Sequence, residues 1–201
     1  ITPAMTTGAH LTEFAKKYPK RFIDAGIAEE HALVLANALA LDGMRPFVTI
    51  YSTFLQRGYD EVNHDIARMG GNVVVGIDRC GVIGEDGVSH QGIFDVSLLL
   101  PVPGIILAQG RDAAESARLL ATGFTADGPY FLRYSKNAMP EQSLSREPLP
   151  IGRWERLREG EITVITYGDF VGEAEEAARL LEMDGIAMGL VNARFLKPFD
   201  T

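Results

Sequence analysis

Residues 72–92 read NVVVGIDRCGVIGEDGVSHQG, an apolar run followed by a glycine-rich segment. Its first part, Asn72–Asp78, is an apolar run of the length of one strand. Strands that are apolar on both faces are typical of parallel sheets covered by helices. The rest is longer than a strand-to-helix link needs and contains four glycines and a histidine. It is either a solvated loop or part of a ligand site, because ligands gather beyond the carboxyl ends of parallel strands.

Similar apolar runs, separated by helical patterns, occur on both sides of this stretch. This alternation is typical of parallel strands joined by crossover helices. The helix after Arg111 has the clearest start, because Asp112 and Glu115 have capping-box spacing. The sequence therefore predicts an α/β fold with a parallel sheet flanked by helices. The further predicted strands are Arg21–Gly26, Pro46–Tyr51, Gly104–Gln109 and Tyr130–Ser135.

A change of composition marks a domain boundary. Residues 137–152 read NAMPEQSLSREPLPIG, and three prolines among polar residues predict a linker. We expect a first domain at residues 1–136 and an incomplete second α/β domain at residues 153–201, where strand, helix and strand patterns follow one another.

Composition excludes several classes of protein. The chain has 201 residues, 46% of them hydrophobic, and a net charge of -8 without basic clusters, which argues against nucleic-acid binding. A single cysteine, Cys80, excludes an internal disulfide and fits a cytoplasmic location. The longest apolar run, Ala32–Leu41, is too short to span a membrane. The chain begins without Met, and we interpret it as a piece of a longer protein.

Three ionisable residues, Glu29, Glu30 and His31, open an Ala/Leu-rich helix. A buried carboxylate is costly without a partner, so at least one of these groups stays in solvent or meets a ligand. Acidic residues also stabilise a helix N-terminus through its dipole, and spacing alone leaves both interpretations open. Polar residues follow other predicted strands as well, among them the segment YSTFLQR at residues 51–57.

Four segments carry a family resemblance: IAEEHA (27–32), YSTFLQR (51–57), DGVSHQGIFD (86–95) and DGPYFLRYSK (127–136). In this order they resemble the pyrimidine-binding domain of the 1-deoxy-D-xylulose-5-phosphate synthase family, thiamine-diphosphate enzymes of the transketolase group. The resemblance covers nearly the whole chain. It implies the transketolase fold, with the start of that group's C-terminal domain.

The resemblance implies which residues meet the cofactor. Glu29 matches the family's catalytic glutamate, which hydrogen-bonds N1′ of the thiamine diphosphate pyrimidine. Phe54 matches the aromatic side chain that packs on the pyrimidine ring, and Ile27 matches an apolar wall beside it. Arg57 is expected to support the edge of the site.

The resemblance also implies a substrate site. Tyr51, Arg79 and Lys136 match the residues that hold the phosphate of glyceraldehyde 3-phosphate. His90 matches a histidine in the substrate site, where an imidazole exchanges protons near neutral pH. Asp86 is expected to orient the surrounding loop.

Two positions depart from the family pattern. Glu30 stands where the family usually has Gln, which adds a negative charge beside the predicted cofactor site. Lys136 stands where the family has an arginine that grips phosphate. A lysine binds phosphate as a point charge without a bidentate fork, so the substitution bears on triose-phosphate affinity.

The resemblance implies condensation of pyruvate with D-glyceraldehyde 3-phosphate to 1-deoxy-D-xylulose 5-phosphate and CO2, by an intact enzyme that is a homodimer. The family's Gly-Asp-Gly motif for diphosphate and Mg²⁺ does not occur in these 201 residues, so we expect no metal ligands here and no activity from the chain alone. Two alternatives remain: a transketolase or 2-oxo acid dehydrogenase β-subunit domain, and a non-catalytic module that retains the fold.

Overall fold

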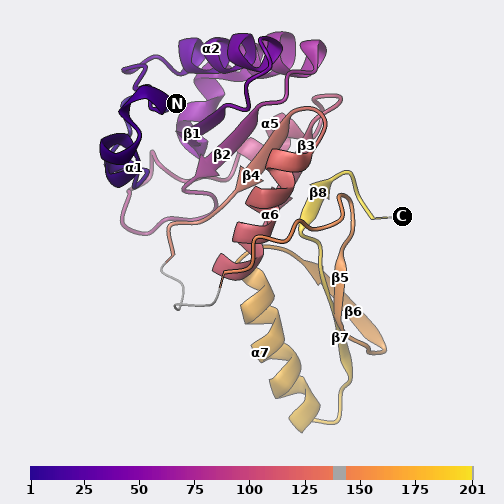
Figure 1. The fold of residues 1–201 in the computed structure, drawn as a ribbon. Coiled ribbons are helices and arrows are strands. Elements are labelled where there is room, and N and C mark those ends of the chain that lie inside the picture. Colours follow the sequence, from indigo (N-terminus) through magenta and orange to yellow (C-terminus); the bar gives the residue numbers. More distant parts are fainter. Residues whose placement is uncertain (138–143, 201) are drawn as a thin grey trace. The chain divides into compact units, whose positions relative to one another are not determined.

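The computed structural model describes residues 1–137 and 144–200. It divides the chain into two units, residues 1–105 with 126–136 and residues 106–125 with 137–201. Figure 1 shows strands and helices in both units, so the predicted α/β fold is confirmed. The sheets are mixed rather than purely parallel, because two pairs of strands are antiparallel: β3 (Ile106–Gln109) with β8 (Phe195–Lys197), and β5 (Glu155–Arg158) with β7 (Met188–Asn192).

Three parallel strands form the centre of the first unit, in the order β1-β2-β4. All three were predicted, and almost every one of their residues is buried, as both-face coverage requires. The register pairs Tyr51 with Asp78 and Ile77 with Arg133, so the three carboxyl ends lie at one edge. The strands are β1 (Phe47–Tyr51), β2 (Val74–Asp78) and β4 (Tyr130–Arg133).

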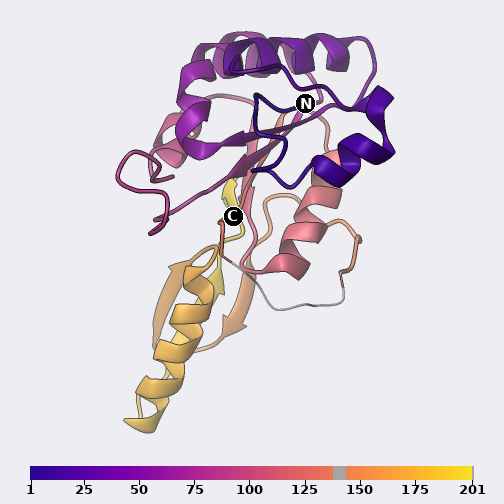
Figure 2. The ribbon, with the colours of Figure 1, turned by 90° about the vertical axis from the view of Figure 1, so that its left-hand side faces the viewer.

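Helices accompany these strands. Figures 1 and 2 show α2 alongside the helical run that follows β1, and the two make direct contacts. The inner side of α2 includes Ala32, Leu33 and Ala36, all with no exposed surface. The helices are α1 (Thr12–Lys17), η1 (Pro19–Arg21), α2 (Glu29–Leu41), α3 (Ser52–Leu55), η2 (Gln56–Gly58), α4 (Tyr59–Glu61), the π-helix η3 (Val62–Ala67) and α5 (Asp95–Leu99).

The strand predicted at Arg21–Gly26 is wrong. Residues 19–21 form the 3₁₀ helix η1, and only a single parallel bridge joins Thr2 to Asp24. Asp24 instead uses its carboxylate locally, accepting hydrogen bonds from the backbone amides of Ala4 and Gly26. Such local hydrogen bonds between a side chain and the backbone compete with the backbone pairing of a β-sheet. This competition explains why the apolar run does not form a strand.

The second unit has two groups of strands. β3 (Ile106–Gln109) pairs with β8 (Phe195–Lys197), and β7 lies between β5 and β6 in a three-stranded sheet. The predicted strand–helix–strand order is confirmed by β6 (Ile162–Thr166), α7 (Phe170–Met183) and β7 (Met188–Asn192). The short strands β5 (Glu155–Arg158) and β8 were not predicted, because neither has a distinct apolar run.

The predicted capping box opens α6 (Ala113–Thr125). The backbone amide of Glu115 donates to Oδ1 of Asp112 at 2.7 Å. The Glu115 carboxylate accepts in return from the amide of Arg111, one residue before the cap, at 2.8 Å. The sequence signal for this helix start is therefore confirmed.

The domain boundaries predicted from the sequence stay a proposal. The structural division assigns residues 106–125 to the second unit, and the predicted linker at 137–152 includes residues 138–143, which lie outside the described residues. Within the described ranges no helix is long and apolar enough to cross a membrane.

Candidate active site

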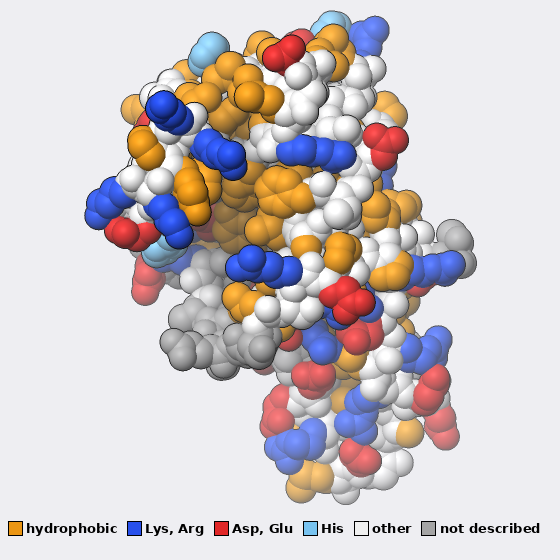
Figure 3. Space-filling model, viewed as in Figure 1, with side chains coloured by type: hydrophobic (Ala, Val, Ile, Leu, Met, Phe, Trp, Pro, Cys, Tyr) orange, Lys and Arg blue, Asp and Glu red, His pale blue; other side chains and the backbone are white. Residues whose placement is uncertain are grey.

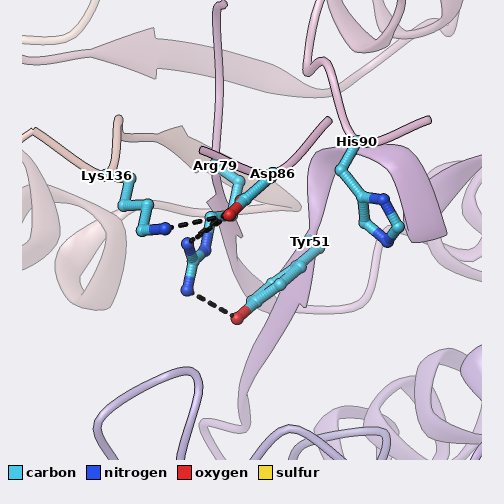
Figure 4. Close-up of a pocket in the computed structure, with 5 residues that line it drawn as sticks. All are labelled: Tyr51, Arg79, Asp86, His90 and Lys136. Atoms are coloured by element: carbon cyan, nitrogen blue, oxygen red, sulfur yellow. Dashed lines mark hydrogen bonds and ion pairs between the residues drawn. The ribbon is translucent and has the colours of Figure 1, made fainter. Parts of the chain in front are cut away.

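The three parallel strand ends of the first unit meet at a cavity of about 300 Å³. Tyr51 ends β1, Arg79 follows β2, and Lys136 lies three residues beyond β4. The loop after β2 supplies the other lining residues. Figure 4 shows the five side chains that line the cavity: Tyr51, Arg79, Asp86, His90 and Lys136.

Arg79 is fixed from the strand side of the cavity. Its Nη2 donates to the Tyr51 hydroxyl at 2.8 Å, and its guanidinium carbon lies 4.7 Å from the centre of that ring. Its backbone adopts φ 61°, an uncommon value for a residue with a side chain, and its amide donates to Oδ1 of Asp78 at 2.7 Å. Although burial opposes the shift, Tyr51 and Asp86 raise the pKa of Arg79. Arg79 is thus a fixed cation at this edge.

Asp86 joins the two cations of the cavity, as the dashed lines in Figure 4 show. One oxygen lies 3.0 Å from Nη1 of Arg79 and the other 2.9 Å from Nζ of Lys136. Lys136 also contacts Glu85 at 2.9 Å. The hydrogen bond from Lys136 lowers the pKa of Asp86, and the same bond raises the pKa of Lys136. A carboxylate of the chain itself therefore satisfies the cations in this structure.

Aromatic rings line the approach to this cation pair. Phe54 stacks on Tyr51 with ring centres 5.4 Å apart and planes 7° apart. His90 meets Phe54 edge-on at 5.5 Å. Nδ1 of His90 lies 2.8 Å from the Ser89 hydroxyl, which leaves its other ring nitrogen for a different partner.

Glu29 lies at the first position of α2 and is only 3% exposed. Its Oε2 is 2.8 Å from Nη1 of Arg57, yet the pair does not meet hydrogen-bond geometry, so this buried oxygen has no hydrogen-bond donor among the described residues. Glu30 is half-buried and His31 exposed. Of the three ionisable residues, Glu29 is therefore the buried carboxylate in need of a partner.

Close packing explains how Arg57 reaches Glu29. Gly58, the next residue, is buried, and a Cβ there would collide with the side chain of Leu33 in α2. The missing side chain lets η2 approach the first turn of α2. Glu29 and Arg57 thus form a second cluster, separate from the lining of the cavity and linked to it through residues 51–58.

Apolar side chains near these clusters are exposed. Ile27 is 76% exposed, and Val82, Val88 and Phe94 of the loop region are also largely in solvent. In Figure 3 hydrophobic side chains gather over the first unit, whereas charged side chains of both signs cover much of the second. Such exposed apolar surface is typical of a face that meets another molecule.

A buried ion pair between β4 and α5 was missed by sequence reasoning. Nε and Nη2 of Arg133 donate to the two oxygens of Asp95 at 2.6 and 3.2 Å, and both side chains are almost fully buried. The pair connects β4 to the helix that follows the loop. An aspartate inside the apolar run IFDVSLLL was the available signal, because buried carboxylates require a partner.

The chain matches the model of the transketolase pyrimidine-binding domain over residues 1–142. The chain belongs to the transketolase pyrimidine-binding domain family. Residues 152–201 match the transketolase C-terminal domain. These matches confirm the transketolase-type resemblance that the sequence motifs carry.

Curated relatives resemble the chain over its whole length. It is 46% identical to 1-deoxy-D-xylulose-5-phosphate synthase of Listeria monocytogenes and 47% identical to the enzyme of the same name from Bacillus cereus. The alignments cover 100% of this chain but only 34% and 32% of those enzymes. The chain thus spans about a third of the length of these relatives.

Solved transketolase structures share the fold. A split-gene transketolase described as an inactive beta4 tetramer has a TM-score of 0.86 at 29% identity, covering 100% of this chain and 66% of that one. A transketolase of Pichia stipitis with sedoheptulose 7-phosphate has a TM-score of 0.84 at 18% identity, covering 100% of this chain and 32% of that one. The second match supports the fold alone.

Proposed function

We propose that this chain supplies the pyrimidine-binding part of a thiamine-diphosphate enzyme that forms 1-deoxy-D-xylulose 5-phosphate and CO2 from pyruvate and D-glyceraldehyde 3-phosphate. The observation that carries the proposal is the Oε2 atom of Glu29, which is buried and lacks a hydrogen-bond donor among the described residues. A carboxylate in that state needs a ligand that can donate or share a proton. The curated relatives of that name support the choice of reaction.

The residues of the first unit fit the pyrimidine end of the cofactor. Glu29 offers an acceptor for a protonated ring nitrogen, while the exposed Ile27 offers an apolar surface of the kind a flat heterocycle covers. Phe54 would pack on the ring. When bound, thiamine diphosphate supplies the carbon that adds to a 2-oxo acid and accepts its electrons on decarboxylation.

The cavity suits the phosphate of the acceptor. Arg79 presents a fixed guanidinium, Lys136 a second positive charge, and Tyr51 a hydroxyl held at 2.8 Å from Arg79. His90 lies edge-on to Phe54 and lines the same cavity as the phosphate residues, and it would exchange a proton with the substrate. The phosphate would replace the Asp86 carboxylate as the ionic partner of Arg79 and Lys136.

Other parts of the cofactor site would come from elsewhere. Among residues 1–137 and 144–200 no group of three or more His, Cys, Asp or Glu side chains is arranged to hold a metal ion. We propose that the Mg²⁺ ligands belong to a diphosphate-binding domain outside this chain. The family resemblance implies that the intact enzyme is a homodimer, and without a diphosphate site we expect the chain alone to be inactive. The single cysteine supports a cytoplasmic location.

A transketolase is the second candidate. A solved split-gene transketolase is 29% identical at a TM-score of 0.86, and Lys136 departs from the arginine expected of the synthase family. The curated relatives favour the synthase.

A substrate comparison on the full-length enzyme separates the candidates. Pyruvate with glyceraldehyde 3-phosphate is compared with ketose phosphate donors and with lipoamide acceptors, and CO2 release and the sugar product are measured. The proposal predicts CO2 release coupled to a five-carbon deoxyketose phosphate. Turnover of ketose donors without CO2 would establish the transketolase instead, and no turnover with any pair would favour a non-catalytic module.

A further inference from the structure

The loop that carries Asp86 and His90 is closed at its base by two glycines. Gly81 and Gly92 exchange both backbone hydrogen bonds, at 2.8 and 2.9 Å. A Cβ on Gly92 would collide with the backbone of Arg79 and Cys80, so the close approach depends on glycine. Within residues 82–91, all of which the structure describes, the only backbone–backbone hydrogen bonds are long: Asp86 to Ile83 at 3.4 Å and His90 to Gly87 at 3.3 Å. Side chains must therefore shape the loop.

One side-chain amide crosses this loop. Nε2 of Gln91 donates to the carbonyl of Ile83 at 2.7 Å and to the carbonyl of Gly87 at 2.6 Å. Its Oε1 accepts from the amide of Ile83 at 2.6 Å. Three of the four bonds that a Gln amide can form thus go to backbone groups at the two ends of residues 83–87.

Fixing these two ends fixes the residue between them. Asp86 lies between Ile83 and Gly87, and its carboxylate reaches Arg79 at 3.0 Å and Lys136 at 2.9 Å. We infer that Gln91 is a positioning residue, whose amide holds the loop so that Asp86 rests on the two cations of the cavity. The inference deepens the proposed function, on which its consequence for triose-phosphate binding rests.

The backbone of neither cation belongs to residues 83–87, although Nζ of Lys136 contacts Glu85 and Asp86 of the loop. Arg79 is held by the Tyr51 hydroxyl and ring and by the bond between its own amide and Asp78. Lys136 follows β4. Loss of the Gln91 amide therefore withdraws Asp86 and leaves the positive charges in place, so an external anion meets less competition. The structure thus predicts a loosened loop together with a stronger anion site.

The test uses the chain itself and inorganic phosphate as the probe. Gln91→Met preserves length and removes all three hydrogen bonds, and Gln56→Met at an exposed position is the matched control. Hydrogen exchange of the Ile83 amide is expected to accelerate about tenfold or more in Gln91→Met, because three bonds of modest net strength are lost. Calorimetry should show phosphate affinity rising several-fold, as in Asp86→Asn, with Gln56→Met unchanged in both measurements.

Unchanged exchange at Ile83, or phosphate affinity that falls, would overturn the inference. If Gln91→Met does not fold, Gln91→Asn keeps the amide but cannot span the loop, and the same two results are expected from it. Failure of the proposed function is seen separately, as absent turnover of pyruvate with triose phosphate in the full-length wild-type enzyme. Exchange at Ile83 and phosphate titration decide the role of Gln91 independently of that assay.

Discussion

Nη1 of Arg57 lies 2.8 Å from Oε2 of Glu29, and this contact joins a half-exposed cation to a buried carboxylate. The Arg57 side chain is 47% exposed and that of Glu29 4% exposed. In the described part of the chain Arg57 is the one ionic partner of Glu29. The half-exposed Arg57 therefore balances the charge of the buried Glu29. Oε2 of Glu29 can still accept a hydrogen bond.

Replacing Arg57 with Ala should destabilise the first unit. The change leaves Glu29 buried without a counter-charge, and we expect a loss of about 1–3 kcal/mol, below that of a fully buried pair because Arg57 is half-exposed. Urea unfolding measures it, with the exposed Arg68→Ala as control. Glu29→Gln in the Arg57→Ala background should recover most of the loss. Equal stability of Arg57→Ala and wild type would contradict this account.

Asp78→Asn should stabilise the chain at neutral pH. Burial raises the pKa of Asp78 above the ordinary value of 3.8, against the opposing hydrogen bond from the Arg79 amide. Because the pKa of this carboxyl is higher in the folded state, its effect on stability is least unfavourable below pH 3.8. Stability is then lost as the pH rises through the folded-state pKa. Asn removes that loss and keeps an acceptor for the amide.

Thermal unfolding of Asp78→Asn and of the wild type is compared from about pH 3 to about pH 8, a range that covers both protonation states of Asp78. The melting temperature of the variant should exceed that of wild type at neutral pH, and the difference should shrink toward acid. The exposed Asp127→Asn is the matched control. A difference that grows toward acid pH would show the opposite linkage.

Breaking the buried ion pair between Asp95 and Arg133 should cause a large loss in the free energy of unfolding. Arg133→Met leaves a carboxylate with no exposed surface uncompensated, and we expect a loss of about 3–5 kcal/mol in denaturant unfolding. Asp95→Leu combined with Arg133→Met should recover most of it, because removing both charges also removes their desolvation cost. A double variant less stable than Arg133→Met would refute this explanation.

The start of α6 offers a smaller and local test. Asp112→Ala removes the acceptor 2.7 Å from the Glu115 amide and should cost about 1 kcal/mol. Asp112→Asn, which retains an acceptor, should cost much less. Equal losses in the two variants would show that charge rather than capping stabilises this helix start.

Sequence patterns predicted the strands that position the site, because β1, β2 and β4 are buried on both faces and leave clear apolar runs. They failed at Arg21–Gly26, where Asp24 bonds local backbone, and at β5 and β8, whose pairing depends on distant partners. The family motifs predicted that Tyr51, Arg79 and Lys136 share one site, and all three line the same cavity, while their binding of phosphate stays a prediction. No pattern revealed that Asp86 bridges both cations or that Gln91 braces the loop, because those contacts arise from loop geometry.

We propose above all that the buried carboxylate of Glu29 meets the pyrimidine of thiamine diphosphate. Calorimetric titration of the full-length enzyme with the cofactor, comparing Glu29→Gln with its neighbour Glu30→Gln, tests this claim most directly. The two substitutions are chemically identical, but Glu30 is half-buried and lies one position further along the helix. We predict that Glu29→Gln lowers cofactor affinity or abolishes turnover while Glu30→Gln preserves both. Wild-type binding and turnover in Glu29→Gln would contradict the account.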